Sequence, residues 1–368
     1  MTQAPASPSP PPSPDKGRLK IGRAAALRLR RRKAGRGFTY LDADGKHVTD
    51  AGTLARIASL AIPPAYRDVR ISHDPRSHLQ AVGQDEAGRL QYRYHPDWEK
   101  VRERRKTGKL GRLISALPRI RAAIARDIES TSLSKDKAIA CAVALIDQGH
   151  IRVGGEAYAK AGSRGAATLL RKHLHVCEGQ VRLRFKGKGG REIECLLDHP
   201  NLCRALTHLA KLPGTRAFQY RTESGVHAIT SADINAYLRR VANAPVSAKD
   251  FRGLAASSTA AAILLEKEPA TSPTAQKRQL SHVMRQVSAL LANTPAVVRK
   301  SYVHPKVVKG FLTGKLKRAY RLVRGTRGRL RVEGVVAKLL GESVPSATRL
   351  STPGEPANQR AGGTGDFA

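Results

Sequence analysis

The sequence predicts an α+β fold, in which a small antiparallel β-rich domain precedes a mainly α-helical domain with an inserted three-stranded β-sheet. Three observations lead to this prediction. Short alternating apolar and polar segments, separated by turn sequences, fill residues 35–98. From about Glu99 onward, apolar residues recur every three or four positions. One strongly alternating segment around Leu183 interrupts that helical pattern.

Both ends of the chain differ in composition from the part between them. Residues 1–14 contain six prolines and no charge, and residues 16–36 contain ten basic residues and no acidic one. We therefore expect residues 1–34 to form a disordered basic tail, in which Ile21–Lys33 becomes helical on contact with a partner. Residues 342–368 are rich in Pro, Gly, Ser and Thr, which predicts a second disordered tail.

The β-rich domain is expected to span residues 35–98. The turn Asp44-Gly45 lies between two short extended segments, which is a hairpin signal. Together the segments predict a sheet with little helix, formed by Phe38–Leu41, Lys46–Val48, Val69–Ile71, His78–Val82 and Leu90–Tyr94.

The helical domain is expected to span residues 99–341. Its first helix covers Val101–Ile128 and is expected to break near Pro118, because proline removes a backbone donor. Further helices are predicted at Lys135–Ile146 and at Val332–Leu340, where Gly341 ends the last one. Two capping boxes predict helix starts, at Thr230-x-x-Asp233 and Ser247-x-x-Asp250.

The inserted sheet is recognised by strict alternation. Val181, Leu183 and Phe185 alternate with basic residues, which predicts a half-buried strand with a basic outer face. The run Gly187-Lys188-Gly189-Gly190 forms the turn, and the return strand carries Ile193, Cys195 and Leu197. Lys188 is therefore placed at a hairpin tip, where its side chain can reach outward.

The charge of the chain calls for a polyanionic partner. Lys and Arg number 66 and Asp and Glu number 29, which gives a formal net charge of +37. A protein that neutralises nucleic-acid phosphates gains affinity by releasing counterions. A membrane-surface protein would concentrate its charge on one amphipathic helix, and ribosomal proteins are usually shorter. Here the charge extends along almost the whole chain, so a nucleic acid is the favoured partner.

The chain offers weak signals for metal or nucleotide chemistry. Cys195-x3-His199-x3-Cys203 is compatible with a metal site, but structural zinc sites favour tighter Cys pairs, so we expect reduced, buried thiols. Gly310–Lys315 resembles a phosphate-binding loop only loosely, and Asp42-x-Asp44 lies in a turn, where Asp is expected. No apolar run is long enough to span a membrane, and no signal peptide is visible, which predicts a cytoplasmic protein.

What remains is phosphodiester chemistry that uses neither metal nor ATP. A tyrosine phenol can attack the phosphorus, arginines can bind the nonbridging oxygens, and a lysine can protonate the leaving 5′ oxygen. Each residue type is a weak signal alone, since most Arg and Lys side chains are solvated and most Tyr side chains pack. An ordered set carries more weight.

Five segments, in their order along the chain, resemble the type IB DNA topoisomerases of the compact poxviral and bacterial kind. The resemblance covers about residues 35–340, and its most specific feature is the nine-residue step from Asn293 to Tyr302. The segments are Gly149-His-Ile-Arg152-Val-Gly154, Phe185-Lys-Gly-Lys188-Gly-Gly190, Ala248-Lys-Asp-Phe-Arg252, Leu291-Ala-Asn293-Thr-Pro and Arg299-Lys-Ser-Tyr302-Val-His-Pro305.

The resemblance implies catalytic roles for five residues. Tyr302 would attack the phosphorus and form a 3′-phosphotyrosyl link, and Arg152 and Arg252 would stabilise the transition state. Lys188 would protonate the leaving 5′ oxygen from the minor groove. Asn293 stands where many members have His, and its amide can donate a hydrogen bond but cannot titrate. The resemblance implies relaxation of supercoiled DNA by strand cleavage, rotation and religation, without a cofactor.

The resemblance also implies how the protein would hold double-stranded DNA. The two domains would form a clamp around the duplex, a monomer would suffice, and the protein would associate with the nucleoid. Direct contacts are implied for Gln91, Tyr92, Tyr94 and Tyr158, although Tyr92 and Tyr94 could instead simply pack. Two departures, at Gly155 and at Gly253-Leu254, concern local contacts. The Ala- and Arg-rich composition indicates a bacterium with GC-rich DNA.

Two alternatives remain open. A tyrosine recombinase shares this catalytic fold and nucleophile, but its box is usually His-x-x-Arg, whereas this chain has Lys249-Asp-Phe-Arg252. Recombinases also begin with a helical bundle, while residues 35–98 are predicted to be β-rich. A histone-like DNA binder would carry the same charge but has no need for the ordered set.

Overall fold

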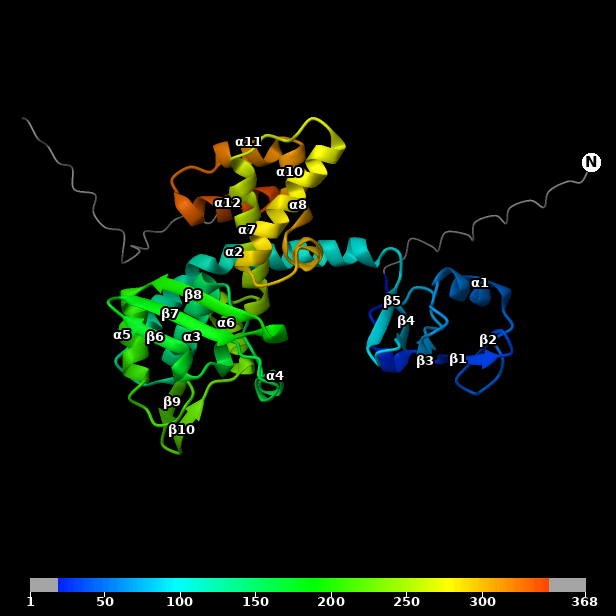
Figure 1. Ribbon diagram of the computed structural model, residues 1–368, viewed down its shortest axis with the longest axis horizontal. Helices are drawn as coiled ribbons and strands as arrows, with labels where there is room; N and C mark the ends of the chain where they lie inside the picture. Colours follow the sequence, from blue (N-terminus) through cyan, green and yellow to red (C-terminus); the bar gives the residue numbers. More distant parts are fainter. Residues whose placement is uncertain (1–18, 344–368) are drawn as a thin grey trace, which may run out of the picture. The chain divides into compact units, whose positions relative to one another are not determined.

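The computed structural model describes residues 19–343 and divides them into two compact units, one up to Arg105 and one from Lys106 (Figure 1). Helix α2, Trp98–Glu129, crosses this division. Residues 1–18 and 344–368, on which most of the two predicted tails fall, lie outside the described residues. Within the described part, the fold is α+β, as the sequence predicts.

The first unit is built on a five-stranded antiparallel sheet with the order β2-β1-β3-β4-β5. Its small core contains Leu29, Ile57, Val69, Ile71 and Ala81. The elements of this unit are β1 (Leu29–Ala34), β2 (Gly37–Leu41), α1 (Ala51–Ser59), β3 (Arg67–Ile71), β4 (Leu79–Gln84) and β5 (Leu90–Tyr94).

The prediction that residues 1–34 form a disordered tail is wrong for Leu29–Ala34, which form strand β1. Leu29 anchors the strand in the core with 1 % of its surface exposed. Among the basic residues that follow, Arg31 is half-buried and the others are exposed. Arg31 donates to the backbone oxygens of Pro63, at 3.1 Å, and Tyr66, at 2.6 Å. The Arg31 guanidinium also lies 4.1 Å from the centre of the Phe38 ring. A run of basic residues can thus form a strand, because the aliphatic part of a long side chain packs while its charged end makes hydrogen bonds.

The predicted Asp44-Gly45 turn is present, but its return segment is not a full strand. The Asp42 carboxylate accepts the backbone N–H groups of Asp44 and Lys46, both at 2.9 Å, so it serves the turn. Beyond the turn a single bridge joins Leu41 and His47. The chain then enters α1, which was not predicted and whose start is capped by the Asp50 side chain.

The second unit contains most of the helices. Helix α2 continues through Pro118, contrary to the predicted break. Buried side chains on both sides of the proline, including Ile114, Leu117 and Ile120, keep both halves packed and offset the lost hydrogen bond. The other helices are α3 (Lys135–Gly149), α4 (Glu156–Lys160), α5 (Pro200–Leu209), α6 (Ser231–Ala242), α7 (Ala248–Leu265), α8 (Pro273–Leu290), α9 (Pro295–Val297), α10 (Pro305–Leu312), α11 (Lys315–Leu322) and α12 (Gly328–Leu340).

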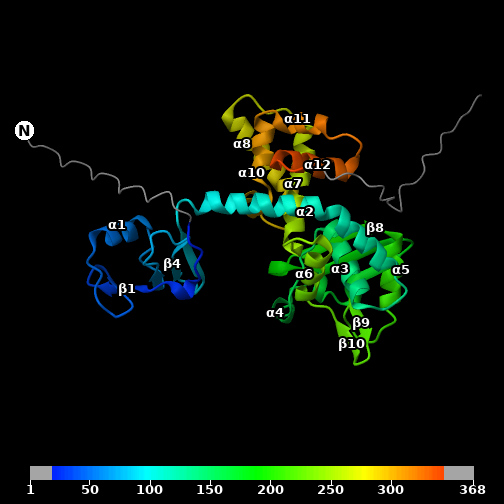
Figure 2. The ribbon, with the colours of Figure 1, turned by 180° about the vertical axis from the view of Figure 1, so that it is seen from behind.

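Helix α3 forms the centre of the second unit. It is buried from Lys137 to Asp147 and packs against α5, α6 and α7 (Figure 2). The predicted capping boxes at Thr230 and Ser247 start α6 and α7. Because α3 is enclosed on most sides, the turn that follows its last residue is held in place by the core.

The inserted three-stranded sheet has the order β6-β7-β8, with β6 at Leu174–Cys177, β7 at Gln180–Lys186 and β8 at Glu192–Asp198. Alternate residues of β7 are buried and exposed, as its sequence predicts. Gly189 and Gly190 adopt φ values of 74° and 73° at the hairpin tip, a region that favours glycine. A second, two-stranded sheet, β9 (Gln219–Thr222) with β10 (Gly225–Ala228), was not predicted.

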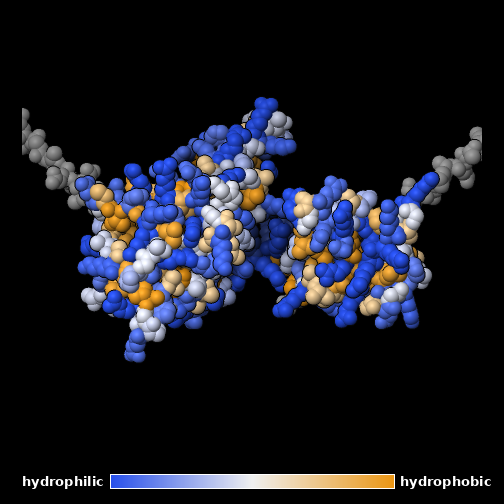
Figure 3. All heavy atoms as spheres, turned by 60° about the horizontal axis from the view of Figure 1, so that its bottom comes forward, coloured by the Kyte–Doolittle hydropathy of each residue, from blue (hydrophilic) through white to orange (hydrophobic). Residues whose placement is uncertain are grey.

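Hydrophilic side chains cover most of the visible surface of each unit (Figure 3). Within residues 19–343, no helix is long and apolar enough to cross a membrane.

Candidate active site

Four of the five residues singled out in the sequence lie together in the second unit. Arg152 donates from Nη1 to the Tyr302 hydroxyl at 3.1 Å and from Nη2 to the Asn293 Oδ1 at 2.6 Å. The Arg252 guanidinium carbon lies 5.3 Å from the centre of the Tyr302 ring. The separations of these residues along the chain range from 9 positions, between Asn293 and Tyr302, to 150 positions, between Arg152 and Tyr302.

Tyr302 ends a π-helical turn, Val298–Tyr302, and only 7 % of its surface is exposed. A π turn is rare and is often found at functional sites. Burial alone would raise the pKa of the phenol, but the charges of Arg152 and Arg252 outweigh burial and hold the pKa below its ordinary value. The two arginines therefore make ionisation of the phenol easier than it is in water, and the phenolate is the nucleophilic form.

The backbone around Tyr302 is held by groups that the sequence analysis did not single out. The Ser257 hydroxyl of α7 accepts the N–H of His304 at 3.0 Å and donates to the Tyr302 carbonyl at 3.4 Å. Lys106 of α2 donates to the Val303 carbonyl at 2.9 Å. These contacts fix the turn from two sides, so the direction of the phenol is set by α2 and α7.

His304 is a fully buried histidine with a structural task. Burial, followed by the nearby charges of Lys106 and Lys306, lowers its pKa to about 4, so the ring is neutral near pH 7. Its Nδ1 accepts the N–H of Lys306, so the ring proton resides on Nε2. Nε2 therefore donates to the Thr107 hydroxyl at 2.8 Å, which ties the start of α10 to α2.

Arg252 lies in the second turn of α7, where the capping box of Ser247 starts the helix. Its Nη1 donates to the His150 carbonyl, and its Nη2 donates to the Leu291 carbonyl at 2.8 Å. Burial and then the charge of Arg152 lower its pKa, but an arginine remains charged at neutral pH. Its buried Nε has no partner among the described residues. One donor of this arginine is thus left for another acceptor.

Arg152 follows the end of α3 through a sharp turn. His150 adopts a left-handed conformation, with φ 54°, as the C-cap of α3. The loop beyond it lies against a second backbone segment, and a Cβ added to Gly165 would meet the Arg152 carbonyl at 2.6 Å and the Gly154 nitrogen at 2.5 Å. Only glycine permits this approach, which fixes the base of the Arg152 side chain.

Asn293 holds Arg152 and the loop before the π turn. Its carbonyl oxygen accepts from Arg152, and its Nδ2 donates to the Leu291 carbonyl at 3.2 Å. Leu291 is the acceptor that Arg252 also uses. The amide therefore connects both arginines through one short loop.

Lys188 is the member of the set that does not contact the others. It lies exposed at the tip of the β7–β8 hairpin, as predicted. Lys188, Arg152 and Arg252 nevertheless line one cavity of about 290 Å³. A Cβ added to Gly187 would meet the Ile193 side chain at 2.9 Å, so the hairpin is tightly closed at the base of the tip.

The four residues implied as DNA contacts fall in different settings. Tyr92 and Tyr94 are 44 % and 43 % exposed on β5, an edge strand, and their ring centres are 6.3 Å apart. Tyr94 also stacks on Trp98. Gln91 points to the other face of the strand, where its amide donates to Asp85 at 2.9 Å. Tyr158, on α4, is 64 % exposed. The tyrosines thus do not pack inside the core.

The residues considered for metal or nucleotide binding have structural roles instead. Among residues 19–343, no group of three His, Cys, Asp or Glu side chains could hold a metal ion. His199 caps α5 by accepting the Leu202 N–H. Gly314 starts α11 in a left-handed conformation rather than opening a phosphate loop. Cys177 is exposed on the edge strand β6, which corrects the expectation that all thiols are buried.

A tyrosine enclosed by two arginines, on a strongly basic α+β chain, is suited to chemistry on a phosphodiester, because fixed cations stabilise the charge that develops there. Comparisons with known proteins specify the family. The profile of "Eukaryotic DNA topoisomerase I, catalytic core" matches residues 95–323, and that of "Bacterial DNA topoisomerase IB, N-terminal domain" matches residues 37–85. DNA topoisomerase 1B of Acanthamoeba polyphaga mimivirus is 30 % identical over 282 residues, which cover 74 % of this chain and 84 % of the viral protein.

The chain belongs to the type IB DNA topoisomerase family. It is an isomerase of DNA topology, and the resemblance noted in the sequence is confirmed.

Proposed function

We propose that this topoisomerase relaxes supercoiled DNA by cutting one strand through a 3′-phosphotyrosyl intermediate, allowing rotation and resealing the strand, without ATP or metal. One observation carries the proposal: the hydroxyl of a buried tyrosine accepts a hydrogen bond from one arginine while a second arginine covers its ring. This arrangement brings a nucleophile and two fixed cations to one point. It supports a reaction in which side chains supply the positive charge.

In the cleavage step, the Tyr302 oxygen forms a bond to phosphorus and the bond from phosphorus to the 5′ oxygen breaks. The phenolic proton passes to solvent, a loss that the lowered pKa of Tyr302 favours. Arg152 and Arg252 stabilise the charge on the nonbridging oxygens of the pentacoordinate transition state. Lys188 donates a proton to the leaving 5′ oxygen.

Asn293 contributes by orientation in this scheme. Its carbonyl holds Arg152, so the guanidinium is aligned before DNA arrives. Its Nδ2–H can turn from Leu291 to a nonbridging oxygen of the bound phosphate. Because an amide does not titrate, this position adds no ionisation to the pH dependence of cleavage.

Resealing reverses the same steps. The phosphotyrosyl bond conserves the energy of the broken phosphodiester, so the free 5′ hydroxyl can attack it without ATP. Rotation about the intact strand between the two steps removes supercoils of either sign. We propose that the two domains clamp the duplex, with Lys100–Arg112 along the backbone and Tyr92, Tyr94, Tyr158 and Gln91 as further DNA contacts. A monomer, working on the DNA of the nucleoid, suffices for this cycle.

The relaxation assay separates this proposal from its alternatives. Wild-type protein incubated with supercoiled plasmid in EDTA, without ATP, is expected to relax the plasmid through a ladder of topoisomers. Exchange of strands between two duplexes would instead identify a recombinase. Binding without any change in topology would identify a histone-like DNA binder and contradict the proposal.

Binding to DNA is expected to weaken steeply with salt. Each phosphate that the protein neutralises releases counterions, so the logarithm of the binding constant should fall with the logarithm of salt concentration with a slope of about −0.9 per phosphate contacted. Fluorescence anisotropy with a labelled duplex between low and physiological salt measures this slope. A binding constant that does not change with salt would contradict phosphate binding as the source of affinity.

A further inference from the structure

Two arginines and two buried carboxylates form a network of ion pairs that reaches the end of α3, next to the proposed active site. Arg121 comes from α2, Asp147 from α3, and Arg329 and Glu333 lie one turn apart on α12. Asp147 is 5 % exposed and Glu333 is 3 % exposed. Two carboxylates buried this deeply are costly unless each is fully paired.

The network pairs every carboxylate oxygen. Arg121 donates from Nε to Asp147 at 2.9 Å and from Nη1 and Nη2 to Glu333 at 2.8 and 2.9 Å. Arg329 donates from Nε to Glu333 at 2.9 Å and from Nη2 to the Asp147 carboxylate. Two positive and two negative charges are thus joined in one ring of hydrogen bonds that connects three helices.

The electrostatics agree with this geometry. Burial alone would raise the pKa of Asp147, but the charges of Arg121 and then Arg329 lower it to about 2. The same carboxylates raise the pKa of Arg121 although burial opposes them. Asp147 and Arg121 therefore remain charged near neutral pH, and the ion pair between them is kept there.

Arg329 extends the network from side chains to backbone. Its Nη2 also donates to the carbonyl of Asp147 at 3.0 Å, in the last turn of α3. Three residues later, the His150 carbonyl accepts from Arg252. Two residues beyond that comes Arg152. Arg329 thus holds the helix end from which one arginine of the proposed site extends and on which the other is anchored.

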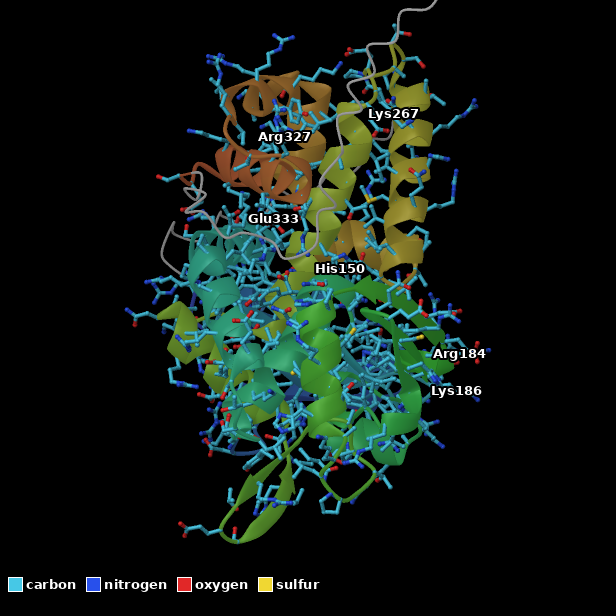
Figure 4. All side chains as sticks on the ribbon, turned by 90° about the vertical axis from the view of Figure 1, so that its left-hand side faces the viewer. His150, Arg184, Lys186, Lys267, Arg327 and Glu333 are labelled. Carbon is cyan, nitrogen blue, oxygen red and sulfur yellow. The ribbon has the colours of Figure 1, made fainter. Side chains whose placement is uncertain are left out.

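The surroundings of Arg329 suit this task. Its side chain is 39 % exposed, whereas those of Asp147 and Glu333 are 6 % and 4 % exposed. Arg329, Glu333 and His150 line a cavity of about 680 Å³, so this end of the network borders open space. Glu333, on α12, and His150 are labelled in Figure 4. Arg329 is therefore the member whose removal leaves both carboxylates still paired with Arg121.

We propose that Arg329 is a positioning residue for the cleavage reaction, acting through the end of α3 on Arg152 and Arg252. This inference rests on the proposed function, because it assigns those arginines to the transition state. Arg329 touches neither DNA nor the phenol in this scheme. Its loss lets the end of α3 shift, and a shift of about 1 Å in a catalytic group can cost about 100-fold in rate.

The first test is single-turnover cleavage by Arg329→Met, with the matched variant Arg327→Met. Arg327 is the exposed N-cap residue of α12, and its side chain has no hydrogen bond or ion pair among the described residues. Arg329→Met is expected to slow cleavage by about 10- to 100-fold while the Kd for duplex DNA stays within about twofold of Arg327→Met. Cleavage at the rate of Arg327→Met, or a loss of rate explained by a weaker Kd, overturns the proposal.

The second test separates positioning from general destabilisation. If Arg329 acts through Arg252, the two substitutions should not be additive. Adding Arg329→Met to an Arg252→Ala variant should then lower the cleavage rate by a clearly smaller factor than Arg329→Met does in the wild type. The same fold loss of cleavage rate in the wild type and in the Arg252→Ala variant overturns the proposal. Arg329→Lys, which keeps the charge but bonds one acceptor, should cleave at an intermediate rate and melt near the wild-type temperature. If Arg329→Lys is folded but cleaves no faster than Arg329→Met, the proposal is also contradicted.

The outcome for Arg252→Ala alone keeps the two proposals apart. If that single variant cleaves at the wild-type rate, the proposed site is wrong. If it is slow and Arg329→Met is not, only the role of Arg329 is wrong.

Discussion

Tyr302→Phe is expected to abolish plasmid relaxation while duplex binding stays unchanged. The substitution removes only the phenolic oxygen, so no bond to phosphorus can form. The ring remains packed in the core, where 7 % of Tyr302 is exposed, and Arg252 still lies over its face. The fold and the cationic surface are therefore preserved. Gel electrophoresis of supercoiled plasmid, with anisotropy for the Kd, measures both parts of the prediction.

Tyr320→Phe is the matched control for this variant. Tyr320 lies on α11, and its ring stacks under Arg331 at 3.7 Å. Its hydroxyl makes no hydrogen bond among the described residues, so its removal should leave relaxation unchanged. If Tyr302→Phe relaxes the plasmid as fast as Tyr320→Phe does, the proposed mechanism is contradicted.

Lys188→Ala is expected to slow strand cleavage by about 10²- to 10⁴-fold, the range that a positioned general acid contributes. The leaving 5′ oxygen is a poor leaving group without a proton. Lys188 is exposed at a hairpin tip closed by glycines, so the substitution should not disturb the sheet. Single-turnover cleavage of a duplex with one labelled strand measures the effect.

A substrate with sulfur in place of the bridging 5′ oxygen tests whether the lost function is proton donation. A thiolate leaves without a proton, so Lys188→Ala should cleave this substrate at close to the wild-type rate. Lys186→Ala provides the comparison, because it removes the same charge from an exposed position on the same hairpin. A variant that stays slow on the sulfur substrate would remove Lys188 from the general-acid role.

Much of the fold was predictable because local patterns and tertiary packing agree. The alternation of Val181, Leu183 and Phe185 matches a sheet with one buried face, and the capping boxes at Thr230 and Ser247 start helices. Predictions were wrong where packing overrides local preference. Strand β1 is stabilised by contacts of Leu29 and Arg31 with distant residues, and Pro118 stays helical because its neighbours are buried.

The candidate site was predictable in its members but not in its support. Arg152, Arg252, Asn293 and Tyr302 stand in an ordered set with a specific spacing, which local sequence displays. The residues that hold these four in place show no such pattern in the local sequence. Ser257 is one of two adjacent serines in α7, and Arg329 is one arginine in a basic chain. Their roles depend on contacts with partners 45 and 182 positions away, which no local pattern reveals.

The covalent intermediate is the central claim, and trapping it tests that claim most directly. Protein denatured during relaxation, then digested with nuclease and trypsin, should yield the peptide Ser301–Lys306 with a nucleotide attached. Tyr302 is the one tyrosine of that peptide, so the mass and fragmentation assign the site. We predict a link from Tyr302 to a 3′ phosphate, with a free 5′ hydroxyl on the other DNA end. A nucleotide on another residue, a link to a 5′ phosphate, or relaxation without any adduct would contradict the account.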